Sequence, residues 1–268
     1  MSITTSTEDR LTSMRGVALV TGASRGIGRA TAIRLAGDFA AVALVARDPI
    51  KLEKAAAEAR AAGAEALSLA EDLRKAEAAH HIVEKLMSRF GRVDALVNVA
   101  GAVPTADLFD LTDADWDDGM ALKFHGTRRL TLQAWDALKA SRGAVVFTSG
   151  STAFVPQPGM AAVGSINAAI VSLAKAFAER GIADGVQVNS ILPGPVLTDR
   201  RQVLIARYAA DHALSPTEAE VHFARSAGIA RLGQPEDIAN AVAFLVSPPA
   251  RWLTGAALRI DGGEVKSL

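Results

Sequence analysis

The sequence predicts an α/β domain in which a parallel β-sheet is covered by helices on both faces. Short runs rich in Val, Leu and Ala alternate with longer, Ala-rich amphipathic stretches along nearly the whole chain. The short runs are continuously apolar instead of alternating, which is typical of strands buried on both faces. A repeated strand–helix alternation connects neighbouring strands through right-handed crossovers, so the strands are expected to run parallel.

Seven of the short runs are the predicted strands, because each is too short to be a helix of ordinary length. They span residues 16–21, 40–46, 64–70, 93–99, 143–149, 186–191 and 256–260. The predicted helices span residues 25–37, 49–62, 75–90, 113–139, 160–180 and 235–246. Pro235 suits the first turn of the last helix, where Glu236 and Asp237 complement the positive end of the helix dipole.

One long segment, residues 197–228, interrupts this alternation. It follows the carboxyl end of a predicted strand, and an insertion there lies over the ligand crevice of an open α/β sheet. We therefore expect a helical flap at about residues 197–228. Residues 1–15, rich in Ser and Thr, are expected to form a flexible tail, and residues 16–268 a single domain without linker or repeat.

The composition excludes several classes of function. Half of the 268 residues are hydrophobic, enough for a sizeable core, and the 29 basic residues balance the 29 acidic ones, which disfavours nucleic-acid binding. The chain has no cysteine, so it has no disulfide, thiolate nucleophile or Cys-ligated metal, and no His, Asp and Glu cluster has metal-ligand spacing. It contains no run of 18 apolar residues. We expect a cytoplasmic protein with neither a nucleic-acid nor a membrane partner.

A glycine-rich turn directly follows the first predicted strand and opens the first predicted helix. It reads Thr21-Gly22-Ala23-Ser24-Arg25-Gly26-Ile27-Gly28. Its glycines permit a tight turn and the close approach of a pyrophosphate, while the helix N-terminus offers amide donors and a positive dipole. This order of strand, turn and helix predicts a doubly wound Rossmann fold that binds a dinucleotide.

The end of the second predicted strand indicates which dinucleotide binds. An acidic residue there binds the ribose 2′-hydroxyl of NAD, whereas a 2′-phosphate requires a cation. The position is Ala46, followed at once by Arg47, and Arg25 lies in the glycine turn. Two guanidiniums bind a phosphate in fork geometry, so NADP(H) is the predicted cofactor. In the alternative interpretation, Arg47 only covers the sheet edge and Asp48 only caps the next helix.

Further motifs follow the later predicted strands in order. They are Asp72-Leu73, Asn98-Val99-Ala100-Gly101, the run from Asn189 to Thr198 that contains Pro193-Gly194-Pro195-Val196, the run from Arg231 to Asp237, and Asp261-Gly262-Gly263. With these motifs and the glycine turn, the chain resembles the short-chain dehydrogenase/reductase family from Gly16 to its C-terminus. The resemblance implies an oxidoreductase that transfers a hydride between a nicotinamide and a small carbonyl or alcohol. It also implies a homo-oligomer, either a dimer or a tetramer.

The same resemblance implies a catalytic set that this chain does not carry. In the family a Tyr donates the proton, a Lys four residues later lowers the pKa of that Tyr, a Ser polarises the carbonyl, and an Asn on the preceding helix positions a water. Here Val163 occupies the Tyr position, Asn167 the Lys position and Lys123 the Asn position. We hypothesise that Lys123 reaches the ribose and the active-site floor, with Asn167 as its hydrogen-bond partner. Alternatively, Lys123 is a solvated helix residue and Asn167 a satisfied buried amide.

The proton donor and the carbonyl-polarising group remain open at this point. Ser149 and Ser151 both lie at the end of the fifth predicted strand, and the sequence does not choose between them. Lys123 with a pKa lowered by burial is a candidate proton donor, as are Tyr208, His212 and His222 of the flap. The predicted catalytic residues are Ser149, Ser151, Lys123 and Asn167. The predicted cofactor-binding residues are Gly22, Ser24, Arg25, Gly26, Ile27, Gly28, Arg47, Asp72, Leu73, Asn98, Ala100, Gly101, Lys123, Asn167, Pro193, Gly194, Val196 and Thr198.

The altered catalytic set leaves a second function open. The favoured hypothesis is an NADP(H)-dependent oxidoreductase with changed acid–base residues. A serine and a cation remain, and orientation alone supplies part of the catalysis of hydride transfer. The alternative is a catalytically impaired NADP(H)-binding pseudo-enzyme or regulatory subunit. A purely structural partner is a weaker reading, since it would not need Arg25 and Arg47.

Overall fold

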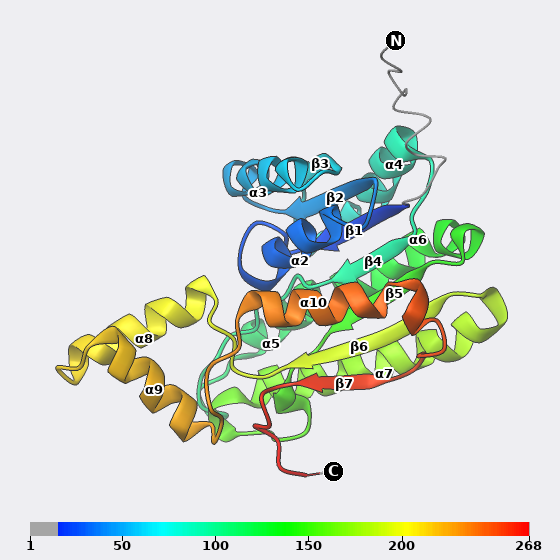
Figure 1. Cartoon of the computed structure of the whole chain (residues 1–268). Coiled ribbons are helices and arrows are strands. Elements are labelled where there is room, and N and C mark those ends of the chain that lie inside the picture. Colours follow the sequence, from blue (N-terminus) through cyan, green and yellow to red (C-terminus); the bar gives the residue numbers. More distant parts are fainter. Residues whose placement is uncertain (1–15, 268) are drawn as a thin grey trace.

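A seven-stranded parallel sheet forms the centre of the computed structural model, which describes residues 16–267 (Figure 1). The strands are β1 Val17–Thr21, β2 Ala41–Ala46, β3 Glu65–Ala70, β4 Ala95–Asn98, β5 Ala144–Thr148, β6 Gln187–Pro193 and β7 Ala257–Ile260. Their order in the sheet is β3-β2-β1-β4-β5-β6-β7, and every neighbouring pair is parallel. The predicted doubly wound parallel sheet is therefore confirmed. The predicted tail of residues 1–15 lies outside the described residues.

Three helices cover each face of the sheet. On one face lie α2 Gly26–Ala36, α3 Pro49–Ala61 and α10 Pro235–Leu245, and on the other lie α4 Ala78–Phe90, α6 Thr127–Ser141 and α7 Ala161–Asp184. Successive residues of one strand enter opposite cores: Leu19 of β1 packs with the α4, α6 and α7 side, and Val20 with the α2, α3 and α10 side. This two-sided burial is the reason that the strands are continuously apolar in sequence.

The predicted helix at residues 113–139 is interrupted in the structure. It consists of α5 Asp113–Gly119, a π-helix η1 Met120–Gly126 and α6, in direct succession. Thr112 caps α5 through a reciprocal hydrogen-bonded box with Asp115. No sequence pattern that we used distinguishes a π-helix from an α-helix, and π-helical turns often occur at functional sites.

Strands β1 to β3 are added toward one edge of the sheet and β4 to β7 toward the other, so the strand order reverses at β1, which lies between β2 and β4. Loops leaving β1 and β4 diverge there, and this opens a crevice at the carboxyl ends of the strands. The hydroxyl oxygen of Thr21 connects the end of β1 to the segment after β4, because it accepts hydrogen bonds from the backbone N–H groups of Val99 and Ala100, each at 3.0 Å.

Residues 197–228 form a hairpin of two helices, α8 Asp199–Asp211 and α9 Pro216–Ser226, which projects from the sheet (Figure 1). The hairpin has its own small apolar cluster, formed by Ile205, Ala209, Ala219, Ala224 and Leu232. Ser215 caps α9 through a second capping box with Glu218. The helices predicted for this segment are thus present, and their role as a flap over the substrate stays a prediction.

The segment Pro158–Asp184, which contains α7, is long and apolar enough to cross a membrane. Its apolar character is accounted for in part by the core, because Ile170, Ala174 and Phe177 pack into the cluster beneath α4 and α6. Length and composition of this kind also occur in the core helices of proteins that do not enter membranes.

A carboxylate at the end of α7 fastens that helix to α6. Asp184 accepts hydrogen bonds from Lys139 Nζ at 2.8 Å, Trp135 Nε1 at 2.8 Å and Arg180 Nε at 2.7 Å. These donors stabilise the ionised form and hold the pKa of Asp184 well below its usual range.

We predict that Asp184→Asn lowers stability at pH 7, because the amide loses the charge that these donors stabilise. A carboxyl whose pKa is depressed by folding stabilises the protein above its unfolded pKa, about 3.9, and loses that contribution as the pH falls below it. The deficit of the variant should therefore shrink below about pH 4 in urea unfolding. Asp136→Asn, at an exposed site on the same face of the sheet, is the control. Equal midpoints for both variants at pH 7 would contradict this prediction.

Candidate active site

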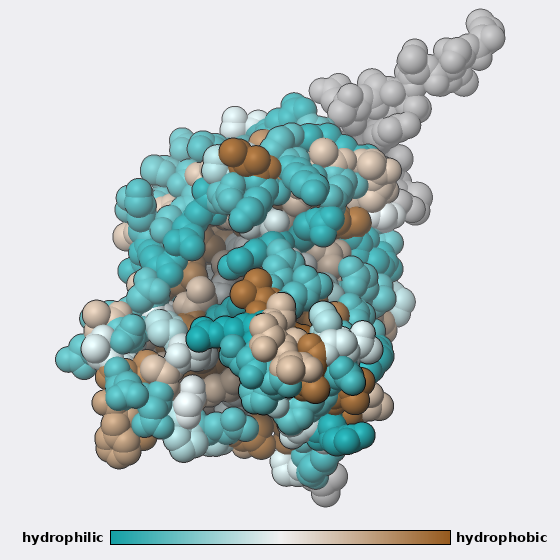
Figure 2. Space-filling view, turned by 90° about the vertical axis from the view of Figure 1, so that its left-hand side faces the viewer, coloured by the Kyte–Doolittle hydropathy of each residue, from teal (hydrophilic) through white to brown (hydrophobic). Residues whose placement is uncertain are grey.

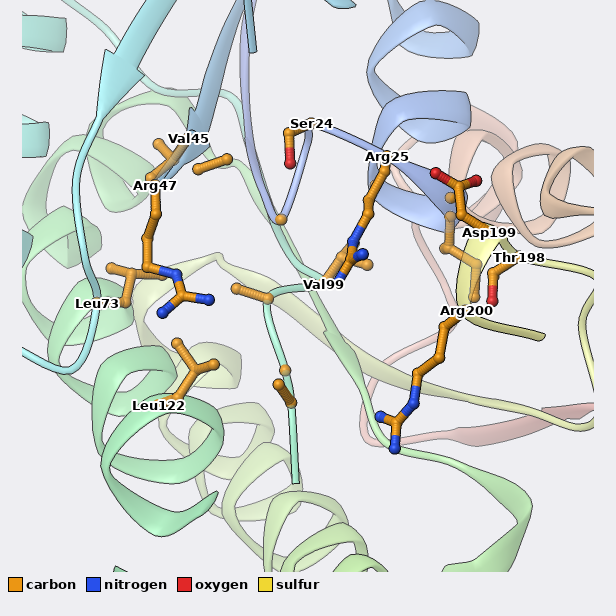
Figure 3. A pocket seen from close by; sticks show the side chains of 18 of the residues that line it. Ser24, Arg25, Val45, Arg47, Leu73, Val99, Leu122, Thr198, Asp199 and Arg200 are labelled. Atoms are coloured by element: carbon orange, nitrogen blue, oxygen red, sulfur yellow. The ribbon is translucent and has the colours of Figure 1, made fainter. Parts of the chain in front are cut away.

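A cleft opens at the carboxyl ends of β1, β2 and β4, and the glycine turn forms one of its walls (Figure 3). Gly22 has φ of 67°, and a Cβ on it would lie 3.0 Å from the backbone nitrogen of Ala100. A Cβ on Gly28 would lie 2.2 Å from the carbonyl oxygen of Gly22. Only glycine allows the turn to fold this tightly, which leaves the first-turn amides of α2 facing the cleft.

Eleven of the predicted cofactor-binding residues line this cleft. They are Gly22, Ser24, Arg25, Gly26, Ile27, Gly28, Arg47, Leu73, Ala100, Gly101 and Thr198. Eight further residues line it that were not predicted from the sequence: Val45, Ala46, Glu71, Val99, Ala102, Leu122, Asp199 and Arg200. Most of these are sequence neighbours of selected residues at strand ends, and that position is the signal that would have found them. Arg25 and Arg47 flank the cleft from opposite sides, and Arg200 extends into it from α8 (Figure 3).

The other predicted cofactor-binding residues lie outside the lining of this cleft. Asp72 accepts a hydrogen bond from the Arg74 backbone and lies 4.0 Å from Arg47. Asn98 is buried and donates to the hydroxyl of Thr131. Pro193, Gly194 and Val196 continue β6 toward the last strand: Gly194 bonds the carbonyl of Ile260, and Val196 forms a bridge with Gly233. Their contacts to a cofactor remain predictions.

A basic recess adjoins the cleft at the end of β2. Ser24, Arg25, Arg47, Asp48 and Lys51 line it. Asp48 caps α3 by accepting from the backbone N–H groups of Ile50 and Lys51, so that part of the alternative interpretation is correct. Lys51 was missed by the sequence analysis, although it lies within the first turn of the capped helix. Capping and a cationic recess therefore occur together at this strand end.

Figure 2 shows the molecule from the side on which α8 and α9 project. The face is mostly hydrophilic, and a hollow opens near its centre with apolar side chains inside it. A largely apolar hollow with a few polar groups is the usual form of a small-molecule site.

Lys123 lies next to this cleft on the π-helix η1. Its side chain runs past Gly101, where a Cβ would lie 3.0 Å from Cδ of the lysine. Its ammonium donates to Oδ1 of Asn167 at 2.5 Å and to the carbonyl oxygen of Ser149 at 3.2 Å. Burial lowers the pKa of Lys123 to about 8, and no carboxylate among residues 16–267 pairs with it. The side chain is therefore not a solvated helix residue.

Asn167 connects three elements around this lysine. Its Nδ2 donates to Oγ1 of Thr152 at 2.7 Å, and its backbone carbonyl accepts from the hydroxyl of Ser149 at 2.8 Å. Glycine at position 150 leaves room for the amide, because a Cβ there would lie 2.6 Å from Nδ2. The structure thus brings Lys123, Asn167 and Ser149 together, and it adds Thr152, which no sequence signal indicated.

The remaining catalytic candidates lie apart from this group of contacts. Ser151 is buried in a short turn, η2 Ser151–Ala153. Val163, which occupies the position of the family's tyrosine and is not itself a candidate, packs beside a small apolar cluster. In the flap, Tyr208 stacks on His212 with ring centroids 3.9 Å apart, and its hydroxyl pairs with Nε2 of His222 at 3.0 Å. None of these three flap residues lines the cleft.

Comparison with known proteins agrees with this geometry. The sequence profile of a family described as enoyl-(acyl carrier protein) reductase matches residues 22–264. The chain is 33% identical over 252 residues to the short-chain reductase protein NovJ of Streptomyces niveus. The aligned region covers 94% of this chain and 95% of NovJ. The chain belongs to the short-chain dehydrogenase/reductase family.

Other family members are similarly close. The 3-oxoacyl-[acyl-carrier-protein] reductase FabG of Staphylococcus aureus is 31% identical over 248 residues, covering 92% of this chain and 96% of FabG. A crystal structure of L-sorbose reductase from Gluconobacter frateurii, complexed with NADPH and L-sorbose, superposes with a TM-score of 0.91 at 30% identity. That match covers 95% of this chain and 98% of the sorbose reductase. The short-chain dehydrogenase/reductase fold is therefore shared over nearly the full length.

We predict that Gly28→Ala destabilises the protein and weakens nucleotide binding. The new Cβ would press on the carbonyl oxygen of Gly22, and backbone must move to relieve the contact. Overpacking of this kind costs about 1–3 kcal/mol, which corresponds to a fall of several degrees in Tm. Gly159→Ala is the matched control, because a Cβ there meets nothing within 4 Å. Calorimetry that gives the two variants the same Tm would refute the prediction.

Proposed function

We propose that the protein is an NADP(H)-dependent oxidoreductase that transfers a hydride between the nicotinamide and a small carbonyl or alcohol. In this proposal Lys123 takes the acid–base role of the missing tyrosine. The observation that carries the proposal is the partly buried ammonium of Lys123, held by Asn167 and Ser149 next to the cleft that the glycine turn lines.

The residues of the cleft fit a dinucleotide. The glycine turn and the amides at the start of α2 suit a diphosphate, and the apolar side chains of Leu73 and Val99 suit a base. The recess with Arg25, Arg47 and Lys51 suits a 2′-phosphate, because its three cations outnumber its one carboxylate, Asp48, which caps α3. When bound, the reduced nicotinamide supplies the hydride. The complex of the similar L-sorbose reductase with NADPH supports this choice of cofactor.

We expect the protein to bind NADPH much more tightly than NADH, as measured by fluorescence titration at fixed salt. Arg47→Ala should weaken NADPH binding about 10- to 100-fold, the usual worth of a hydrogen bond to a charged group, and leave NADH binding unchanged. Lys51→Ala should act in the same direction. Lys54→Ala, an exposed cation on the same helix, is the control. Equal affinity of the wild type for both nucleotides would refute the 2′-phosphate assignment.

The geometry of Lys123 suits proton transfer to a carbonyl oxygen. An ammonium has three N–H donors, and the bonds to Asn167 and Ser149 use two of them. The third remains for the substrate. Because the pKa of this group lies near 8, it carries a proton at neutral pH and still releases one readily. Carbonyl reduction needs the ammonium, so its rate falls as the pH rises through about 8, whereas alcohol oxidation needs the free amine and shows the opposite dependence.

We predict that Lys123→Met lowers kcat for carbonyl reduction about 10²–10⁴-fold, the usual contribution of a general acid, and removes the pH dependence near 8. NADPH oxidation is measured with L-sorbose, 2,3-butanedione and ethyl acetoacetate as probes. Lys175→Met, at an exposed position of α7, is the control. Wild-type rates in Lys123→Met would refute the role of this lysine. A wild type that binds NADPH and reduces no probe would favour the nucleotide-binding subunit without chemistry.

Assembly and location complete the proposal. We infer a homo-oligomer, a dimer or a tetramer, in which the exposed apolar side chains near the C-terminal ends of α7 and α10 are covered. Ile182 and Phe244 belong to this set, as does Trp252, which is 98% exposed in the single chain. Burying such side chains on association is favourable. A cytoplasmic location remains a prediction.

A further inference from the structure

The active site contains a hydroxyl outside the catalytic set described so far. Thr152 lies in η2, the short turn after β5, and it is the residue that completes the contacts of Asn167. We propose that the hydroxyl of Thr152, and not that of Ser149, hydrogen-bonds the substrate's carbonyl oxygen beside the ammonium of Lys123. The inference rests on the proposed function, since it names the second group that receives this substrate.

The hydroxyl proton of Ser149 is used in a hydrogen bond to the backbone. A serine hydroxyl has one proton to donate, and that of Ser149 goes to the backbone carbonyl of Asn167 at 2.8 Å. Ser149 is only 5% exposed, and its own backbone carbonyl accepts from Lys123. The residue therefore connects the end of β5 to α7 and to the lysine, and it keeps no proton for a ligand.

The orientation of the Asn167 amide follows from the chemistry of its neighbours. Lys123 has only donors, so the atom that faces it must be the amide oxygen Oδ1. The amide nitrogen Nδ2 then faces Thr152, and the hydroxyl oxygen of Thr152 acts as the acceptor at 2.7 Å. The proton of this hydroxyl is not used in that bond, and no acceptor within residues 16–267 is hydrogen-bonded to it.

Thr152 and Lys123 are attached to the two ends of one planar amide. The separation of their donor atoms is therefore fixed by a rigid group and by two short hydrogen bonds. A hydroxyl that accepts a hydrogen bond becomes a stronger donor through cooperativity. In the proposal both donors meet one substrate oxygen, where together they would stabilise the negative charge that develops on it during reduction. Gly150 permits this arrangement, because a side chain there would meet Nδ2.

The division of roles keeps the reaction balanced. The carbonyl carbon gains the hydride, the π electron pair of the C=O bond moves to the oxygen, and that oxygen takes a proton from Nζ of Lys123. The lysine regains its proton from water. Thr152 keeps its own O–H bond throughout and acts only through the hydrogen bond.

The test compares Thr152→Val, Thr152→Ala and Thr152→Ser with the wild type, using NADPH and the three carbonyl probes named above. Thr152→Val should lower kcat about 10²-fold, the usual effect of removing one oxyanion donor, and Thr152→Ser should restore most of the rate. Thr152→Ala should match Thr152→Val, which covers the case in which valine disturbs the fold. The Kd for NADPH should stay within about twofold in all three, because Thr152 does not line the cofactor cleft.

The pH dependence of kcat distinguishes a Thr152 that donates to the substrate from a Thr152 that only positions Asn167. A substrate donor lowers the rate at every pH, including the acidic plateau where Lys123 is fully protonated. If the valine and alanine variants kept the wild-type plateau and only their alkaline pKa moved, Thr152 would be a positioning residue and the inference would be overturned.

Two further outcomes are distinguishable from these. Loss of rate in Ser151→Ala together with full rate in the Thr152 variants would assign the hydroxyl to Ser151 and overturn the inference. A wild type that binds NADPH but reduces none of the probes would instead overturn the proposed function, and this inference with it.

Discussion

The hydrogen bond from Lys123 to Asn167 is the interaction on which the arrangement of the active site depends. It joins the π-helix η1 to α7 across the ends of the central strands. The ammonium is partly buried and has no carboxylate partner within the described residues, so neutral acceptors must satisfy it. That requirement orients the Asn167 amide, and the amide in turn orients Thr152. One desolvated cation therefore sets the donors and acceptors around it.

The nucleotide cleft and the group of polar side chains around Lys123 beside it position their functional groups in different ways. At the nucleotide end, glycines remove side chains so that backbone amides face the ligand, and guanidinium and ammonium groups supply charge from flexible side chains. Beside the cleft, where we propose that the substrate binds, short hydrogen bonds between partly buried side chains fix the positions of the groups. Binding of a highly charged cofactor tolerates mobile cations, whereas catalysis requires preorganised donors.

The sequence predicts most of the fold because each strand is buried on both faces and each helix on one, and such burial leaves a local pattern in the chain. The glycine turn is predictable for the same reason, since its conformation depends on residues adjacent in sequence. The contact between Lys123 and Asn167 was predictable because each residue occupies the position at which the family carries the other residue type, which indicated a retained polar pair. Thr152 and Lys51 were not found, because their roles depend on which way side chains point across elements distant in sequence. The subdivision of residues 113–141 was missed because α- and π-helices share one composition.

The π-helix also determines how the segments before and after it are rotated about a common axis. In an α-helix each residue turns the chain by about 100°, and a π-helical stretch holds more residues per turn. It therefore shifts the rotational phase of α6 relative to α5, so α5 contacts α7 while α6 contacts α4. An insertion or deletion within Met120–Gly126 would turn one helix against its packed neighbours. The packing of α5 and α6 therefore depends on the number of residues in this stretch as well as on their side chains.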